Sequence, residues 1–187
     1  MSLRMLSVLA VFTLASGLMA LTVGEIEASE YKAVSENLPK LKIAFADPAW
    51  DGKTIPDGQQ CPSQDGHGAT PALIVDNIPS GTNAIIVEFN DSDYRPLSYD
   101  GGHGKIGFWI GAANPATLPS VPGLSDKLPK GSFIEADNRA WGKGYVPPCS
   151  GGRGNSYFAI IKAVYKAKSD KEKSLLLATG TIELGSY

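Results

Sequence analysis

The chain has 187 residues, of which 43% are hydrophobic and 19% charged, as expected for one globular domain that buries a core. Its formal net charge at pH 7 is −2, so it lacks the broad positive field with which proteins hold nucleic-acid phosphates. Nucleic acid is therefore excluded as a general partner, and an anionic ligand needs a local site.

The N-terminal residues have the pattern of a secretory signal peptide. Arg4 precedes an apolar run over residues 5–21, and a charged stretch over residues 25–40 follows it. We expect residues 1–28 to be the signal peptide and processing region, with residues 29–187 forming a single domain in the periplasm or outside the cell. The alternative is an uncleaved anchor, because the run approaches the ~18 apolar residues of a spanning helix. After processing we expect no stable membrane span.

From Leu41 onward, short apolar runs alternate with clusters of Gly, Pro, Asn and Asp, which is typical of a mostly β domain. The clearest predicted strands are rich in β-branched and aromatic residues and cover residues 84–89, 106–110 and 157–165. The last strand has apolar residues on both faces near its start, which favours a central position in a sheet. One short helix is predicted over residues 170–177, with Ser169 as its N-cap.

The sequence contains two cysteines, Cys61 and Cys149. In an exported protein an even pair indicates one disulfide, which would hold two distant loops together. The alternative is two separate buried thiols. The sequence has no Cys-x-x-Cys or His-x-x-x-His spacing of a zinc site, so we expect no metal and no cofactor.

Ionisable residues follow or precede the predicted strands within glycine-rich loops, where binding sites are commonly built. Asp91 and Asp93 come after the first strand, and His103 lies between glycines directly before the second. The glycines and prolines of residues 142–155 lead into the third strand, and backbone amides there could approach an anion. The structural alternatives are an Asx turn for the two aspartates and a purely structural role for the histidine.

In this order the blocks resemble the phosphatidylethanolamine-binding protein family, also called Raf kinase inhibitor-like, and particularly its bacterial exported branch. Asp91-Ser92-Asp93 matches the Asp-Pro-Asp block of the family, and His103 matches the histidine that follows it. Tyr145 through Tyr157 aligns without a gap on the family block that begins Tyr-x-Gly-Pro-Cys-Pro-Pro and ends His-Arg-Tyr. A cysteine-containing loop at residues 61–68 precedes both blocks. The resemblance spans residues 41–187.

The resemblance implies a mostly β fold of two antiparallel sheets with one or two short helices. It further implies a small cavity that accepts phosphate, acetate or phospholipid head groups. Family members are described as modulators of kinases and other partners, not as catalysts, so we expect no enzyme activity. The residues of this chain that the resemblance assigns to ligand binding are Asp91, His103, Pro148, Cys149, Asn155 and Tyr157.

The pocket motif departs from the family at Asn155 and Ser156, where the family has histidine and arginine. Asn155 can donate a hydrogen bond but carries no charge, so phosphate binding should be weaker or more dependent on pH. Arg153 could supply the missing charge from the neighbouring loop. If Cys61 is bonded to Cys149, His67 could replace the missing histidine and, with Asp91, offer ligands to a divalent metal.

The leading interpretation is an exported, non-catalytic protein that binds a small anion or phosphorylated head group. Two alternatives remain open. In the first, the pocket is degenerate and the loops bind an unknown protein partner, as an interaction or inhibitor module. In the second, the protein is a hydrolase with His103 as general base and Asp91 as its orienting partner, although the sequence has no Gly-x-Ser-x-Gly motif.

Overall fold

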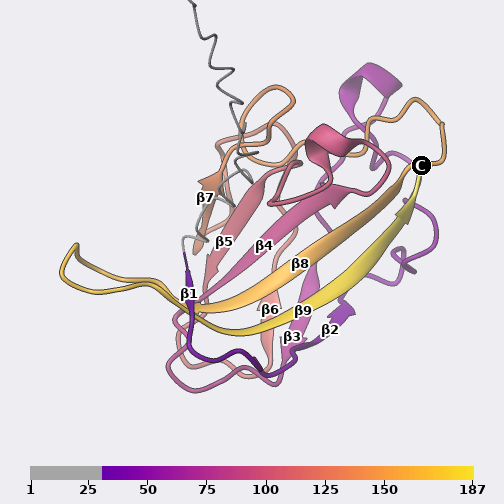
Figure 1. Ribbon diagram of the computed structural model, residues 1–187. Coiled ribbons are helices and arrows are strands. Elements are labelled where there is room, and N and C mark those ends of the chain that lie inside the picture. The colour runs from indigo at the N-terminus through magenta and orange to yellow at the C-terminus, as the bar shows by residue number, and fades with distance from the viewer. Residues whose placement is uncertain (1–30) are drawn as a thin grey trace, which may run out of the picture.

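The computed structural model describes residues 31–187, so the predicted signal peptide lies outside the described residues. These residues form a six-stranded sheet in the order β1-β9-β8-β4-β5-β7 and a three-stranded sheet in the order β2-β3-β6 (Figure 1). The strands are β1 (Lys32–Ala33), β2 (Lys42–Phe45), β3 (Leu73–Asp76), β4 (Ala84–Asp91), β5 (Lys105–Trp109), β6 (Ala116–Leu118), β7 (Ser132–Ala136), β8 (Ser156–Tyr165) and β9 (Leu175–Ser186). The prediction of a mostly β fold with two sheets is confirmed.

The large sheet is antiparallel except at its edge, where β1 runs parallel to β9. Its central strands are β4, β5 and β8, and these are the three strands that the sequence predicted. β8 lies between β4 and β9, which confirms its predicted central position. All eight residues of β4 are buried, because both of its faces are covered.

The main core fills the space between the two sheets. β4 and β8 contribute Ile85, Val87, Phe89, Ala159 and Ile161, and the small sheet contributes Leu73, Val75, Ala116 and Leu118. These residues alternate along their strands, as expected when one face of each strand is buried against the other sheet. Burial of this apolar area stabilises the frame on which the loops are mounted.

Helical structure in the described residues is confined to two short 3-10 turns, Pro62–Gln64 and Arg95–Leu97. The predicted helix over residues 170–177 is wrong, because β9 begins at Leu175 and the preceding residues form a turn. In this turn the Glu172 carboxylate accepts hydrogen bonds from the Tyr165 hydroxyl at 2.7 Å and from the Lys168 backbone N–H at 3.2 Å. The β8–β9 hairpin therefore closes where helix-like sequence was expected, and it projects from the body of the molecule (Figure 1). No helix among residues 31–187 is long and apolar enough to cross a membrane.

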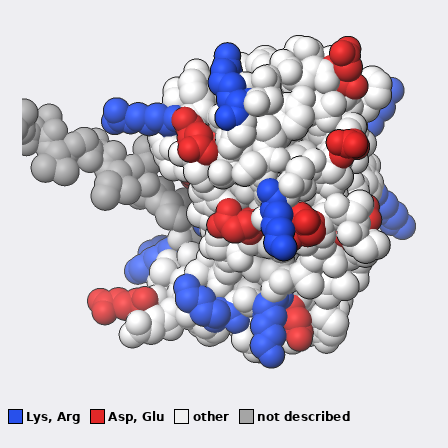
Figure 2. Space-filling view, turned by 90° about the vertical axis from the view of Figure 1, so that its right-hand side faces the viewer, with Lys and Arg blue, Asp and Glu red and all other residues white. Residues whose placement is uncertain are grey.

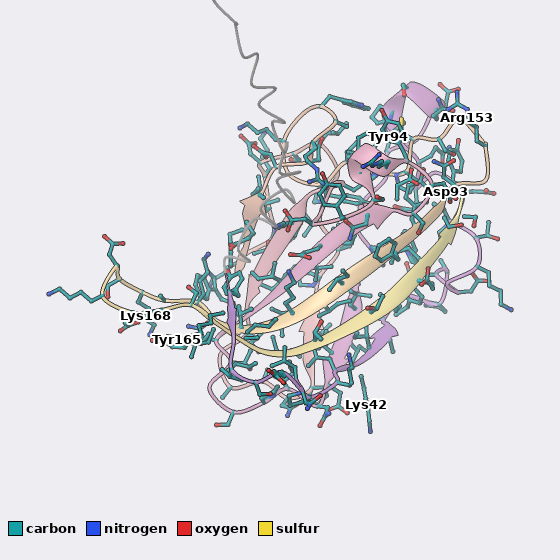
Figure 3. The ribbon with its side chains drawn as sticks, in the orientation of Figure 1. Lys42, Asp93, Tyr94, Arg153, Tyr165 and Lys168 are labelled. Atoms are coloured by element: carbon teal, nitrogen blue, oxygen red, sulfur yellow. A yellow bond between two sulfur atoms is a disulfide. The ribbon has the colours of Figure 1, made fainter. Side chains whose placement is uncertain are left out.

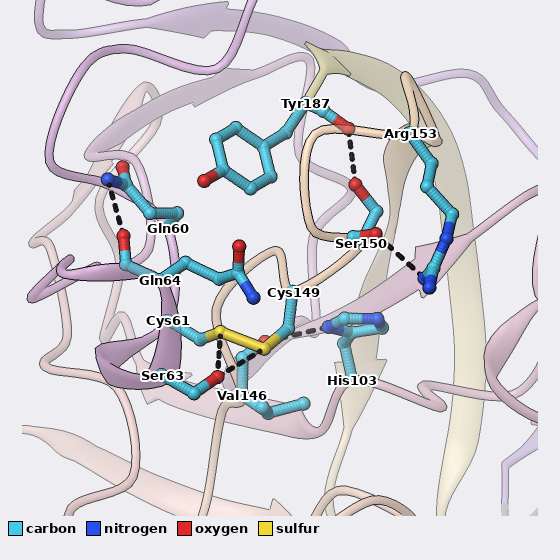
Figure 4. The surroundings of a disulfide bond; sticks show 10 residues. All are labelled: Gln60, Cys61, Ser63, Gln64, His103, Val146, Cys149, Ser150, Arg153 and Tyr187. Carbon is cyan, nitrogen blue, oxygen red and sulfur yellow. Dashed lines mark hydrogen bonds between the residues drawn. A yellow bond between two sulfur atoms is a disulfide. The ribbon is translucent and has the colours of Figure 1, made fainter.

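A disulfide joins Cys61 to Cys149 across 88 positions of sequence, which confirms the predicted bond. The Cys61 backbone N–H also donates to the Pro148 carbonyl at 2.9 Å. The Ser63 hydroxyl lies 3.2 Å and 3.3 Å from the two sulfur atoms (Figure 4). Together these contacts fix the loop before β3 against the loop before β8.

We expect the double substitution Cys61→Ser/Cys149→Ser to lower the free energy of unfolding by about 2–4 kcal/mol, because a long loop of the unfolded chain is then no longer closed. Equilibrium unfolding in urea measures this change. Ser63→Ala is the matched control, since it alters the surroundings of the sulfur atoms and keeps the covalent bond. An unchanged unfolding midpoint in the double variant would contradict a stabilising role for the disulfide.

Candidate functional site

The candidate site lies at the end of the large sheet where β4 ends and β8 begins. Asp91 is the last residue of β4 and pairs with Tyr157 of β8. His103 is held beside this pair because its backbone N–H donates to the Phe89 carbonyl at 2.9 Å. Figure 3 shows Tyr94 and Arg153 at the same end of the molecule. Three segments that are distant in sequence therefore meet at one place.

A cavity of about 550 Å³ occupies this place. Five of the six predicted ligand-binding residues line it; Pro148 does not. Pro148 is buried, and its carbonyl accepts the Cys61 backbone N–H. The lining residues are Asp91, Tyr94, Pro96, Leu97, His103, Arg139, Ala140, Trp141, Val146, Cys149, Ser150, Arg153, Asn155 and Tyr157.

Asp91 is 3% exposed and accepts three hydrogen bonds. Its Oδ1 atom accepts from the backbone N–H groups of Asp93 at 2.9 Å and Tyr94 at 3.1 Å, and its Oδ2 atom accepts from the Asn155 side chain at 2.9 Å. Asp91 thus forms the Asx turn of the structural alternative, but its carboxylate is buried instead of solvated, and it lines the cavity. Asp93 does not line it, because its carboxylate accepts the Ser156 backbone N–H at 2.7 Å.

His103 is 3% exposed, and its ring orientation is fixed by a hydrogen bond. Nδ1 lies 2.7 Å from the Val146 carbonyl oxygen, and since a carbonyl can only accept, Nδ1 must carry the proton. Burial lowers the pKa of His103, although the bond to Val146 and the charge of Asp91 oppose this shift. The ring is therefore neutral at pH 7, and Nε2 presents a lone pair. Nothing in residues 31–187 forms a hydrogen bond with Nε2.

This geometry bears on the hydrolase hypothesis. The expected orienting partner, Asp91, makes its three hydrogen bonds with Asp93, Tyr94 and Asn155. The His103 ring is oriented by the Val146 carbonyl instead. The predicted His103–Asp91 orienting pair is therefore wrong.

The Tyr157 hydroxyl is the second buried polar atom that lines the cavity without a hydrogen bond from the described residues. It lies near Asp91, Ser150 and the Cys149 backbone, and burial followed by the charge of Asp91 raises the pKa of Tyr157 to about 12. The hydroxyl therefore stays protonated at neutral pH and can donate a hydrogen bond. The Tyr157 ring packs edge-on against His103, with ring centroids 5.4 Å apart.

The loop between β7 and β8 forms one rim of the cavity. Asn138 shapes this loop, because its side-chain oxygen accepts the backbone N–H groups of Ala140 at 3.0 Å and Trp141 at 2.8 Å. Arg139 and Trp141 line the cavity from here. The Arg139 guanidinium donates to the Tyr99 carbonyl and lies 4.2 Å from the centroid of its ring. Sequence reasoning missed these rim residues, because they lie outside the matched blocks.

Arg153 lines the cavity, as the hypothesis of a compensating charge requires, and donates to the Ser150 carbonyl at 2.8 Å. Ser156 lies outside the cavity lining, and its hydroxyl lies 3.4 Å from that of Ser186. The hypothesis that His67 replaces the missing histidine is wrong, because His67 is exposed and does not line the cavity. Within residues 31–187, no three His, Cys, Asp or Glu side chains are grouped to hold a metal.

The structure predicts the tautomer and the titration of His103. ¹⁵N NMR should show the proton on Nδ1 at pH 7 and a titration midpoint below the ordinary value of about 6.5. Because the folded pKa is lowered, the unfolded chain takes up the proton first, and His103 destabilises the fold as pH falls through 6.5. The free energy of unfolding of the His103→Gln variant should not show this decrease as pH falls. A proton on Nε2 would contradict the proposed tautomer, and a midpoint above 6.5 would contradict the effect of burial on the pKa of His103.

Neither a scan against protein-family models nor a search of curated proteins finds a match. Solved structures do match. A phosphatidylethanolamine-binding protein (PEBP) homologue from Chlamydia trachomatis is 21% identical with a TM-score of 0.51, and the match covers 79% of this chain and 97% of that one. YbcL of E. coli, described as a member of the mammalian PEBP family, is 18% identical with a TM-score of 0.51, and the match covers 80% and 98%. The chain has the fold of the phosphatidylethanolamine-binding proteins.

Proposed function

We propose that this protein is exported, is not a catalyst, and binds a small anion or phosphorylated head group in the cavity beside Asp91. The observation that carries the proposal is the pair of buried, unpartnered polar atoms, His103 Nε2 and the Tyr157 hydroxyl, in a cavity that two arginines also line. Buried polar atoms are rarely left without a partner, and such atoms beside a cavity indicate a ligand.

The donors that an oxyanion needs are available on several walls. The Tyr157 hydroxyl makes no hydrogen bond within residues 31–187, although Asp91 lies near enough to raise its pKa. Arg139 and Arg153 each have one backbone carbonyl partner, and a guanidinium has five N–H donors, so both can also bind an anion. The cavity volume of about 550 Å³ lies within the range of small-molecule sites.

The distribution of surface charge favours a local anion site and argues against a broad positive surface as the binding region. Figure 2 shows basic and acidic side chains interspersed on the face in view. The formal net charge of the chain is −2. An anion would therefore be held by the groups that line the cavity and not by the field of the whole protein.

The side chains of nucleophile type in the cavity support a non-catalytic role. Cys149 is bonded to Cys61 and therefore has no thiol. The Ser150 hydroxyl donates to the Tyr187 carbonyl, so its proton is directed away from His103. Nucleophilic catalysis requires a hydroxyl or thiol bonded to its base.

A protein-interaction role is the second candidate, because Tyr94 and Trp141 line the cavity and Tyr99 contacts Arg139, which also lines it. Tyr94, Tyr99 and Trp141 are 53%, 59% and 46% exposed. Tyrosine and tryptophan are enriched among the residues that dominate binding energy at protein interfaces. A partner protein could therefore contact this rim whether or not the cavity is occupied.

We expect the mature protein to bind phosphoethanolamine, and Tyr157→Phe and Arg153→Gln each to weaken binding about tenfold or more, since each removes a donor to a charged group. Isothermal titration calorimetry measures the affinity. Tyr165→Phe and Lys168→Gln make comparable chemical changes at the opposite end of the molecule (Figure 3) and should leave it unchanged. Absence of binding by phosphate, phosphoethanolamine and anionic lipid would overturn the ligand-binding proposal.

Export predicts that the full chain, expressed in a bacterium, is recovered outside the cytoplasm with the signal region removed. The small residues Ala15, Ala20 and Ala28 suit cleavage. Intact-mass measurement of the recovered protein should show a new N-terminus within the processing region and a mass 2 Da below that of the reduced chain, because the disulfide removes two hydrogens. Recovery of the unprocessed chain in the membrane fraction would favour the uncleaved anchor.

A further inference from the structure

We propose that the cavity selects oxyanions that still carry a proton, so that it binds a singly protonated phosphate monoester and discriminates against a sulfate monoester of the same size and charge. The inference rests on the proposed function and specifies the protonation state of its ligand. The residue that sets this selectivity is His103, assisted by Asp91.

His103 offers a hydrogen-bond acceptor, Nε2, to the ligand. Its backbone and its ring are both fixed by Val146: the Val146 N–H donates to the His103 carbonyl at 2.9 Å, and Nδ1–H donates to the Val146 carbonyl at 2.7 Å. The proton is therefore held on the side of the ring away from Nε2. A ligand atom that meets Nε2 must donate a hydrogen bond, and a fully deprotonated oxyanion has no proton to give.

Asp91, beside His103, adds a further hydrogen-bond acceptor. A carboxylate has about four lone-pair sites, and three hydrogen bonds are made to that of Asp91. An oxyanion without a proton would therefore face two buried acceptors, Nε2 of His103 and the Asp91 carboxylate, and could donate to neither. Leaving buried polar groups unpaired costs free energy, and this cost discriminates strongly between ligands.

Charge and hydrogen-bond donors around His103 are balanced for a monoanion. The ionisable groups that line the cavity with His103 are Asp91 from β4, Tyr94 from the loop after β4, Tyr157 from β8, and Arg139 and Arg153 from the loop between β7 and β8. Two guanidinium groups and one carboxylate give these walls one net positive charge when His103 and Tyr157 are neutral. A monoanion balances this charge. Its unprotonated oxygens can accept from Tyr157 and the arginines while its P–O–H group donates to His103.

Methyl phosphate and methyl sulfate test the inference, because as monoanions they differ mainly in the proton. The second pKa of a phosphate monoester is about 6, so near pH 6 a large fraction of methyl phosphate carries the proton. Calorimetric titration of the mature protein at this pH should show methyl sulfate binding about tenfold or more weakly than methyl phosphate. The affinity for methyl phosphate should fall as pH rises from 6 to 8, since the proton is lost.

The variant His103→Gln places an amide that can donate where the imidazole only accepts. It should bind methyl sulfate and show a flatter pH profile for methyl phosphate. Asp91→Asn provides a second test on the neighbouring acceptor if His103→Gln does not fold. His67→Gln is the matched control, because His67 is exposed and outside the cavity lining, and it should retain the discrimination of the wild type.

The outcomes separate the inference from the proposed function. Equal binding of the two esters by the wild type, with no loss of methyl phosphate affinity above pH 6, overturns the inference and leaves the anion-binding function standing. Discrimination that His103→Gln and Asp91→Asn both retain also overturns it. Binding of neither ester, nor of phosphoethanolamine, overturns the proposed function and the inference with it.

Discussion

The site depends on the reciprocal hydrogen bonds between His103 and Val146. Each residue donates to the other, by the Val146 N–H and by Nδ1–H of the imidazole, so the loop before β5 and the loop before β8 are locked together at the cavity. This approach requires glycine on both sides of His103. A Cβ atom on Gly102 would lie 2.3 Å from the Leu97 Cα atom, and one on Gly104 would lie 2.5 Å from the Gly144 carbonyl oxygen. The Gly-Gly-His-Gly sequence is therefore a packing requirement as well as a feature of the site.

Buried amide side chains hold the remaining loops in place. Asn90 is 1% exposed, and its side-chain oxygen accepts the backbone N–H groups of Gly101 at 3.0 Å and Gly102 at 3.3 Å. In the rim loop that carries Arg139, the Asn138 side-chain oxygen likewise accepts the backbone N–H groups of Ala140 and Trp141. These bonds satisfy backbone N–H groups of loops that no strand pairs, so they favour one conformation of each loop. A cavity with fixed walls can distinguish ligands by single hydrogen bonds.

The sequence predicted the elements whose pattern is local and missed those set by distant contacts. The three central strands were predictable because β-branched and aromatic residues are dense there. The helix over residues 170–177 was not formed because Glu172 binds Tyr165 and Lys168 across the hairpin. The order of motifs placed Asp91, His103 and Tyr157 in one site, whereas Arg139 reaches it only through the fold of its loop. The disulfide bonds Cys61 to Cys149, which lines the cavity, and leaves His67, six residues after Cys61, exposed.

The replacement at Asn155 shows how charge and protonation are divided in the cavity. The uncharged Asn155 amide donates a hydrogen bond to the Asp91 carboxylate and places no positive charge beside His103. Positive charge is then supplied by Arg139 and Arg153, which are exposed residues of the surrounding loops. Exposed arginines stay charged at any physiological pH and attract anions without regard to protonation. The buried groups, in contrast, interact through hydrogen bonds of fixed direction, so under the proposed selectivity the loop arginines would recognise the charge of a ligand while His103 and Asp91 would recognise its proton.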